Sequence, residues 1–238
     1  MRYEKSSMFD AEYMKENMMG PNCVKILEEM MAQTAIKPGM RVLDIGCGKG
    51  LTSIFLAREF GVTVFATDLW ISATENYERF EAMGLGDAVI PIHADALALP
   101  YADGFFDAAV SVDAYFYFGG EDAGYMDRCL APMVKPGGPI IIGIPGIKTD
   151  LPGLPDEMVG SVSAEDFATF RSTRWWTQYF AASRLFETER IWEFSGFSEA
   201  WSDWLQCDDN PYAVSDRAML RADGGRFMNI ICAIGRRV

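Results

Sequence analysis

The sequence predicts an α/β fold, in which strands and helices alternate and an open sheet carries a ligand site. Residues 40–60 begin as a short apolar strand, turn through spaced glycines and continue as an apolar pattern of helical period. A second apolar strand, residues 62–67, ends at an acid about 20 residues beyond those glycines. A strand, a glycine turn and a helix in series open a ligand site at the carboxyl end of a strand in such sheets.

The glycine turn indicates what kind of ligand the site holds. Gly46, Gly48 and Gly50 occupy every second position, which lets the backbone turn sharply and a ligand lie close against it. A dinucleotide fingerprint would have its third glycine where this chain has Leu51. Asp44, two residues before the first glycine, would repel a pyrophosphate but can pair with an ammonium group. The pattern favours a ligand with amino-acid and nucleoside parts.

Composition excludes several classes of partner. The 238 residues suffice for a sizeable core, and half of them are hydrophobic. With a net charge of −13 and no cluster of Lys and Arg, we expect neither a nucleic-acid partner nor an anionic membrane surface. No stretch has the roughly 20 apolar residues of a membrane span, and no signal peptide is apparent. Five scattered cysteines and one histidine predict a cytoplasmic protein with reduced thiols and no metal site.

The first half of the chain supplies further elements in order. Residues 1–36 carry methionine and aromatic side chains that usually indicate packing, and a turn at 20–22 starts a helix. Asp68 ends the second strand, where a carboxylate can accept both ribose hydroxyls, although it could instead cap the next helix, as could Ser72. A helix over 73–83 precedes a third strand over 89–93. Its histidine, His93, we interpret as structural.

The fourth strand ends at Val112 and is followed by Asp113 and four aromatic residues, 115–118. Ligands bind beyond such strand ends, so a reacting group belongs there. We expect a helix over 123–133, a Lys-Pro-Gly-Gly turn and a fifth strand over 139–144. An irregular insert runs to about Gly160. The remaining expected elements are helices over 164–170 and from 174, a strand over 185–194, a helix over 200–206 and a strand over 227–234.

Four motifs in order resemble the class I S-adenosylmethionine-dependent methyltransferases of the small-molecule type. They are Asp44 with G-x-G-x-G, Asp68, Asp95 with Ala96, and the series L-P, F-D and K-P-G-G ending at Gly138. The resemblance spans about 38–143, less than half of the chain. It implies a Rossmann-like seven-stranded sheet with helices on both faces and an antiparallel seventh strand. The single domain would comprise an N-terminal helical cover (1–36), a cofactor-binding core (37–144), an insert or lid (145–182) and a C-terminal completion of the sheet (183–238).

The resemblance also implies S-adenosylmethionine as methyl donor, a small-molecule acceptor, and roles for particular residues. Asp113 and Tyr117 are the candidates for a catalytic base. The cofactor-binding candidates are Asp44, Gly46, Cys47, Gly48, Gly50, Asp68, Leu69, Asp95, Ala96 and Val112. The substrate-binding candidates are Tyr3, Tyr13, Tyr115, Trp175 and Trp176. For the aromatic run at 115–118 and for the two tryptophans, ordinary packing is the alternative.

Other interpretations stay open at this point. A nicotinamide oxidoreductase shares the α/β opening, but the glycine spacing and Asp44 oppose it. A non-catalytic sensor or partner subunit that binds S-adenosylmethionine would keep all four motifs. The acceptor, the choice among O, N, S and C methylation, the use of a general base and a homodimeric state are all left open by the sequence.

Overall fold

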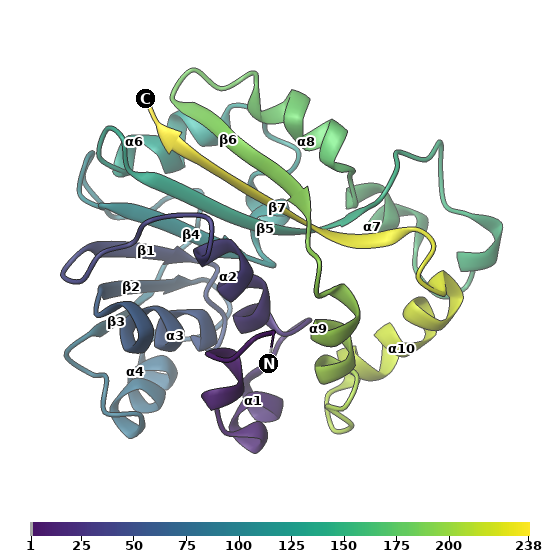
Figure 1. Ribbon diagram of the computed structural model, residues 1–238, viewed down its shortest axis with the longest axis horizontal. Helices are drawn as coiled ribbons and strands as arrows, with labels where there is room; N and C mark the ends of the chain where they lie inside the picture. The colour runs from purple at the N-terminus through teal and green to yellow at the C-terminus, as the bar shows by residue number, and fades with distance from the viewer. Residues whose placement is uncertain (1) are drawn as a thin grey trace.

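The computed structural model describes residues 2–238, which form a seven-stranded sheet in the order β3-β2-β1-β4-β5-β7-β6 (Figure 1). β7 pairs antiparallel with both β5 and β6, and β1 to β5 are parallel. This confirms the expected seven-stranded sheet and its antiparallel seventh strand. The strands are β1 (Arg41–Ile45), β2 (Thr63–Asp68), β3 (Val89–His93), β4 (Ala108–Val112), β5 (Pro139–Ile147), β6 (Phe186–Glu193) and β7 (Met228–Arg237).

Helices cover both faces of the sheet because successive strand side chains point to opposite sides. Val42 belongs to one hydrophobic core and its neighbour Leu43 to the other. The first core takes side chains from α2 (Cys23–Met31), α3 (Leu51–Phe60), α4 (Ala73–Ala82), α9 (Phe197–Trp204) and α10 (Pro211–Asp223). The second takes side chains from α5 (Tyr115–Phe118), η2 (Met126–Leu130), α6 (Ala131–Met133) and α8 (Thr173–Phe180).

The order of the strands creates a crevice at the carboxyl end of β1. β1 lies between β2 and β4, and the helix after β1 contributes to one core whereas the helix after β4 contributes to the other. This reversal is the topological switch point at which open α/β sheets bind ligands. The loops after β1, β2 and β4 therefore converge on one place.

Some expected elements differ from the structure. The expected helix over 123–133 is instead a π-helical turn, η2, followed by the short α6, because Pro132 has no N–H to continue a regular ladder. α10 was not expected, although Asn210 caps it, Pro211 opens it and Gly224 ends it in left-handed geometry. α7 (Ala164–Thr169) and the cap by Ser163 match the expectation closely. In Figure 1, α7, α9 and α10 lie together to the right of the sheet.

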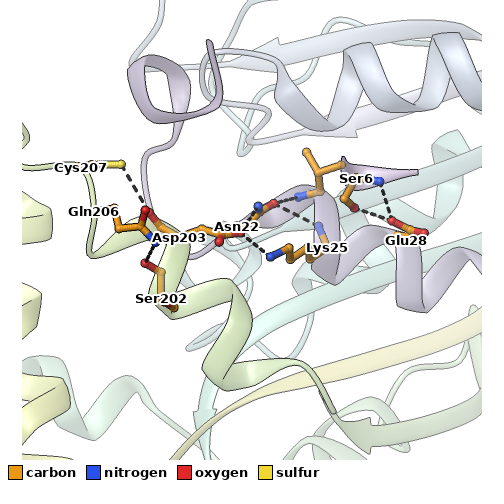
Figure 2. A network of polar contacts seen from close by, with 9 residues as sticks. Ser6, Asn22, Lys25, Glu28, Ser202, Asp203, Gln206 and Cys207 are labelled. Carbon is orange, nitrogen blue, oxygen red and sulfur yellow. Dashed lines mark hydrogen bonds and ion pairs between the residues drawn. The ribbon is translucent and has the colours of Figure 1, made fainter. Parts of the chain in front are cut away.

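The N-terminal segment is held by a polar network (Figure 2). It comprises η1 (Ser6–Met8) and α1 (Ala11–Asn17), and it leads into α2. Asn22 accepts the N–H groups of Val24 and Lys25 and donates to Asp203 of α9 at 2.6 Å. The Lys25 ammonium is also 2.6 Å from Asp203, and Glu28 accepts from Ser6. These bonds fix the stretch between α1 and α2. Within residues 2–238, no helix combines the length and hydropathy needed to cross a membrane.

Candidate cofactor and acceptor site

A cavity of about 430 Å³ lies at the carboxyl ends of β1 to β4. Its walls include the loop after each of these strands and the stretch between α1 and α2. The structure therefore brings together residues that are up to about 100 positions apart in the sequence. Among the predicted site residues, those that line it are Gly46, Cys47, Gly48, Asp68, Leu69, Asp95, Ala96, Val112, Asp113 and Tyr117.

The glycine turn depends on backbone geometry that other residues adopt poorly. Gly46, Gly48 and Gly50 have φ values of 71°, 53° and 80°. A Cβ atom on Gly46 would overlap with Ala114, and one on Gly48 would come within 2.8 Å of the Met19 sulfur. Gly50 is not part of the cavity wall, and a Cβ there would overlap with the ring of Phe80 on α4. Its predicted contact with the cofactor is therefore corrected to a role in starting α3.

Asp44 lies behind the turn and not in the cavity wall, and its expected contact with the cofactor stays a prediction. Its side chain is buried, and Oδ2 accepts hydroxyl bonds from Thr52 and Ser53 at 2.6 Å each. Oδ1 has no hydrogen-bond partner within the described chain. Burial raises the pKa of Asp44 to about 6. A buried acceptor without a donor is rare in proteins, and an ammonium group or an ordered water beside the turn would supply one.

Asp68 holds the turn together as well as lining the cavity. Its Oδ2 accepts the N–H of Gly48 at 2.8 Å. Its Oδ1 accepts the N–H groups of Trp70 and Ile71 at 2.8 and 3.0 Å. The cap of α4 is Ser72, within a complete capping box, so the alternative role for Asp68 as that cap is excluded. A carboxylate has about four acceptor positions, and three are used here, which leaves one for a ribose hydroxyl.

The end of β3 contributes Asp95 and Ala96. Asp95 is exposed and accepts the N–H of Leu97 at 2.8 Å, whereas the carbonyl of Ala96 accepts from the Tyr125 hydroxyl at 3.0 Å. His93 is hydrogen-bonded to the Leu69 carbonyl at 2.8 Å and does not line the cavity. The histidine therefore supports a loop, as expected. The described residues contain no group of His, Cys, Asp and Glu side chains suited to a metal ion.

Asp113 has an unusual backbone and environment. Its φ of 61° makes it the one non-glycine residue with positive φ among residues 2–238. Its N–H donates to the Gly143 carbonyl at 2.8 Å, and its carboxylate lies directly against Gly20, where a Cβ atom would overlap with it. Burial, and then the negative charge of Asp216, raise the pKa of Asp113 to about 8. A carboxyl group with this pKa can accept a proton near neutral pH.

Tyr117 is suited to donating a hydrogen bond and not to acting as a base. Its side chain is largely exposed at the cavity mouth, and its ring centroid lies 5.1 Å from that of Trp70. Partial desolvation and the nearby charges of Asp113, Asp166 and Asp216 raise the pKa of Tyr117 to about 12. The phenol therefore keeps its proton at physiological pH, which leaves Asp113 as the candidate base.

The predicted substrate-binding aromatics do not line the cavity. Tyr115 and Trp176 are fully buried in the second core, where the rings of Trp176 and Phe180 stack at 5.4 Å. The reason is that α8 turns its apolar side toward β6 instead of covering the cavity. Trp175 lies against Tyr179 in the same cluster. The position of this helix outside the cavity wall gives no support to the prediction that it carries acceptor contacts.

The two N-terminal tyrosines are also displaced from the site. Tyr3 is buried, donates to Glu29 at 3.0 Å and lines a separate cavity beside the polar network of Figure 2. Tyr13 packs on the first core. The N-terminal residues that do reach the cavity extend from the end of α1 to the start of α2 and were not predicted: Asn17, Met19, Gly20, Pro21 and Cys23.

Comparisons with known proteins agree with this geometry. Residues 42–138 match the family described as Methyltransferase domain. Methyltransferase GfsG of Streptomyces halstedii is 30% identical over 151 residues, which cover 63% of this chain and 52% of that protein. The chain thus spans about half the length of this relative.

Solved structures share the fold over nearly the whole chain. A SAM-dependent methyltransferase from Geobacter sulfurreducens in complex with S-Adenosyl-L-homocysteine has a TM-score of 0.66 at 24% identity, covering 96% of this chain and 98% of that one. The [4+2]-cyclase SpnF has a TM-score of 0.71 at 16% identity, covering 99% and 96%. Residues 42–138 thus match a methyltransferase domain, and the chain as a whole shares the fold of a solved S-adenosylmethionine-dependent methyltransferase.

Proposed function

We propose that the chain transfers a methyl group from S-adenosylmethionine to a small-molecule acceptor. The observation that carries this proposal is the single cavity that joins the glycine turn and Asp68 to Asp113. The glycine turn and Asp68 are the groups expected to bind a nucleoside ligand, and Asp113 supplies a proton acceptor beyond β4. The similarity to methyltransferase GfsG and to the Geobacter methyltransferase supports the same reaction class.

The residues present fit the donor. Asp68 would hold the ribose, Leu69 and Ala96 would contact the adenine, and the turn at Gly46 would lie against the amino-acid part, with the unpartnered Oδ1 of Asp44 behind it. When bound, S-adenosylmethionine supplies a methyl group activated by its sulfonium. Asp68, Leu69, Ala96 and Gly46 line the cavity, and Asp44 supports its wall.

The protein's own contribution is position and proton transfer. Side chains from five segments enclose the cavity, so an acceptor held there is oriented and partly shielded from water, which can lower a barrier by several kcal/mol. The Asp113 carboxylate would take the proton that a neutral or cationic acceptor must lose. The Tyr117 hydroxyl would donate a hydrogen bond to the acceptor.

Two titrations and one turnover assay test this proposal. Calorimetry should show micromolar binding of S-adenosylhomocysteine and none of NAD, because the glycine spacing and Asp44 disfavour a pyrophosphate. Methyl-labelled donor incubated with a pool of small molecules should yield a labelled small-molecule product. Binding without transfer to any acceptor would favour a sensor or partner subunit, and absence of S-adenosylhomocysteine binding would refute the proposal.

We also infer a reducing compartment such as the cytoplasm. All five cysteines of the chain are free in the structure, and none lies in a C-x-x-C pair. Labelling with a thiol reagent after unfolding, without a reductant, should therefore modify all five.

A further inference from the structure

The mouth of the cavity gathers exposed apolar and aromatic side chains. Trp70 and Tyr117 are 64% and 63% exposed, and their rings meet edge to face. Large hydrophobic groups left in water at one cavity indicate a surface that a ligand covers. The exposed large hydrophobic residues that line this cavity are Met19, Leu69, Trp70, Leu97 and Tyr117.

The same cavity holds a carboxyl group, that of Asp113, which no basic side chain of the described residues pairs with. The Asp113 carboxylate has no hydrogen-bond partner in the described part of the chain. The charged side chain that shifts its pKa is a second carboxylate, Asp216. Asp216 accepts from the Trp204 indole at 2.8 Å, and burial raises its pKa. Lys49 is the basic side chain of the cavity wall, and its ammonium is bonded to the Glu16 carbonyl at 2.7 Å.

These carboxylates come from separate parts of the chain. Asp113 follows β4, Asp166 lies in α7 and Asp216 lies in α10. The charges of all three raise the pKa of Tyr117. They are thus not a local run of acids on one solvated face. The two acids on the side of the cavity where we place the methyl donor, Asp68 and Asp95, differ from Asp113 because they are hydrogen-bonded. Asp68 accepts three backbone N–H groups and Asp95 accepts one. The Asp113 carboxyl group has no such donor, so a cation bound beside it would be the group that favours its ionised form.

We propose that the methyl acceptor is an organic cation, such as an amine that is protonated in solution, with its charge near Asp113 and Asp216 and its apolar body against Trp70 and Tyr117. This inference rests on the proposed function. Aromatic faces and carboxylates together are the groups that recognise ammonium compounds. A phosphate or carboxylate acceptor placed beside Asp113 would find no basic side chain paired with that carboxyl group. An ammonium acceptor must lose a proton before its nitrogen can react, and the Asp113 carboxylate is placed to receive that proton.

Three probes of similar size but different charge test the inference. Benzyltrimethylammonium, benzyl alcohol and benzoate are titrated into protein saturated with S-adenosylhomocysteine, with tryptophan fluorescence as the readout because Trp70 lies at the mouth. We expect the cation to bind at least tenfold more tightly than the alcohol and benzoate to show no saturable binding. Equal binding of all three probes, or a preference for benzoate, would overturn the inference.

Variants separate this inference from its alternatives. Asp113→Asn and Asp216→Asn should each weaken binding of the cation about fivefold or more and leave S-adenosylhomocysteine affinity unchanged. Asp103→Asn, at an exposed turn before β4, makes the same change in net charge. It should alter neither the affinity for the cation nor that for S-adenosylhomocysteine. If Asp113→Asn weakens S-adenosylmethionine but not the cation probe, Asp113 serves the donor's sulfonium and the inference fails. Tight S-adenosylhomocysteine binding without any preference for the cation would refute this inference alone, whereas loss of that binding in the wild type refutes the proposed function.

Discussion

The Asp68 carboxylate has a structural role in addition to its proposed role in binding. Asp68 was predicted from its place after β2 as a ribose ligand, and the structure adds three backbone N–H donors to it. Those donors belong to the glycine turn and to the loop before α4. The sequence indicated that Asp68 ends a strand. Its bond to Gly48 depends on the pairing of β1 with β2 and could not be predicted.

The first prediction follows from this double role. Asp68→Ala should weaken S-adenosylhomocysteine binding at least tenfold and also lower the melting temperature without ligand, since leaving buried donors unpaired costs about 1–3 kcal/mol. Calorimetry and thermal unfolding measure the two effects. Asp95→Ala, which removes an exposed acid of the same cavity, should leave the melting temperature nearly unchanged. An unaltered dissociation constant for Asp68→Ala would exclude the ribose role.

The second prediction concerns the raised pKa of Asp113. Its pKa rises from 3.8 to about 8 in the folded protein, so the folded state binds the proton more tightly than the unfolded state does. The stability that this group contributes is complete below about pH 4 and is lost as the pH rises toward 8. Asp113→Asn should remove that part of the slope, and urea unfolding between pH 5 and about 8.5 measures it. Identical pH slopes for both proteins would contradict the assigned pKa.

At the scale of elements, two glycines allow the effect of backbone strain to be distinguished from the effect of steric overlap. Gly46 and Gly104 both have positive φ, 71° and 63°, but only Gly46 has a neighbour, Ala114, where a Cβ would fall. The third prediction is that Gly46→Ala abolishes measurable S-adenosylhomocysteine binding, whereas Gly104→Ala costs stability of about 1–3 kcal/mol without affecting binding. Equilibrium dialysis and unfolding curves test both variants. Full binding by Gly46→Ala would show that the turn tolerates a side chain.

Local signals predicted most elements, and non-local contacts explain the failures. Apolar runs and caps such as Ser72 and Ser163 act within a few residues, so the strands and several helix starts could be predicted. The helical period of α8 shows that one side of it is apolar, but not which surface that side covers. Trp176 was therefore assigned to a lid and lies in the core. The influence of Asp216 on Asp113 could not be predicted because α10 itself was not recognised.

At the scale of the whole molecule, the two halves of the site have different origins. The donor half comes from consecutive strand ends within 38–143, so its motifs appear in order in the sequence. The acceptor half combines the end of β4, the stretch before α2 and charges from α7 and α10, which only the fold brings together. The net charge of −13 led to the expectation that nucleic acid is not a partner, whereas the proposal of a cationic acceptor rests on Asp113 and on the exposed rings of Trp70 and Tyr117.

The most direct test of the central claim is the rate at which label passes from methyl-labelled S-adenosylmethionine to a small-molecule acceptor, compared between the wild type and Asp113→Asn. We predict a labelled product from the wild type and a rate about 10²–10⁴-fold lower for the variant, because loss of a positioned base has that effect. S-adenosylhomocysteine affinity should be equal in the two proteins. A wild type that binds the donor but never releases label to an acceptor, or a variant with full turnover from pH 6 to about 9, would contradict it.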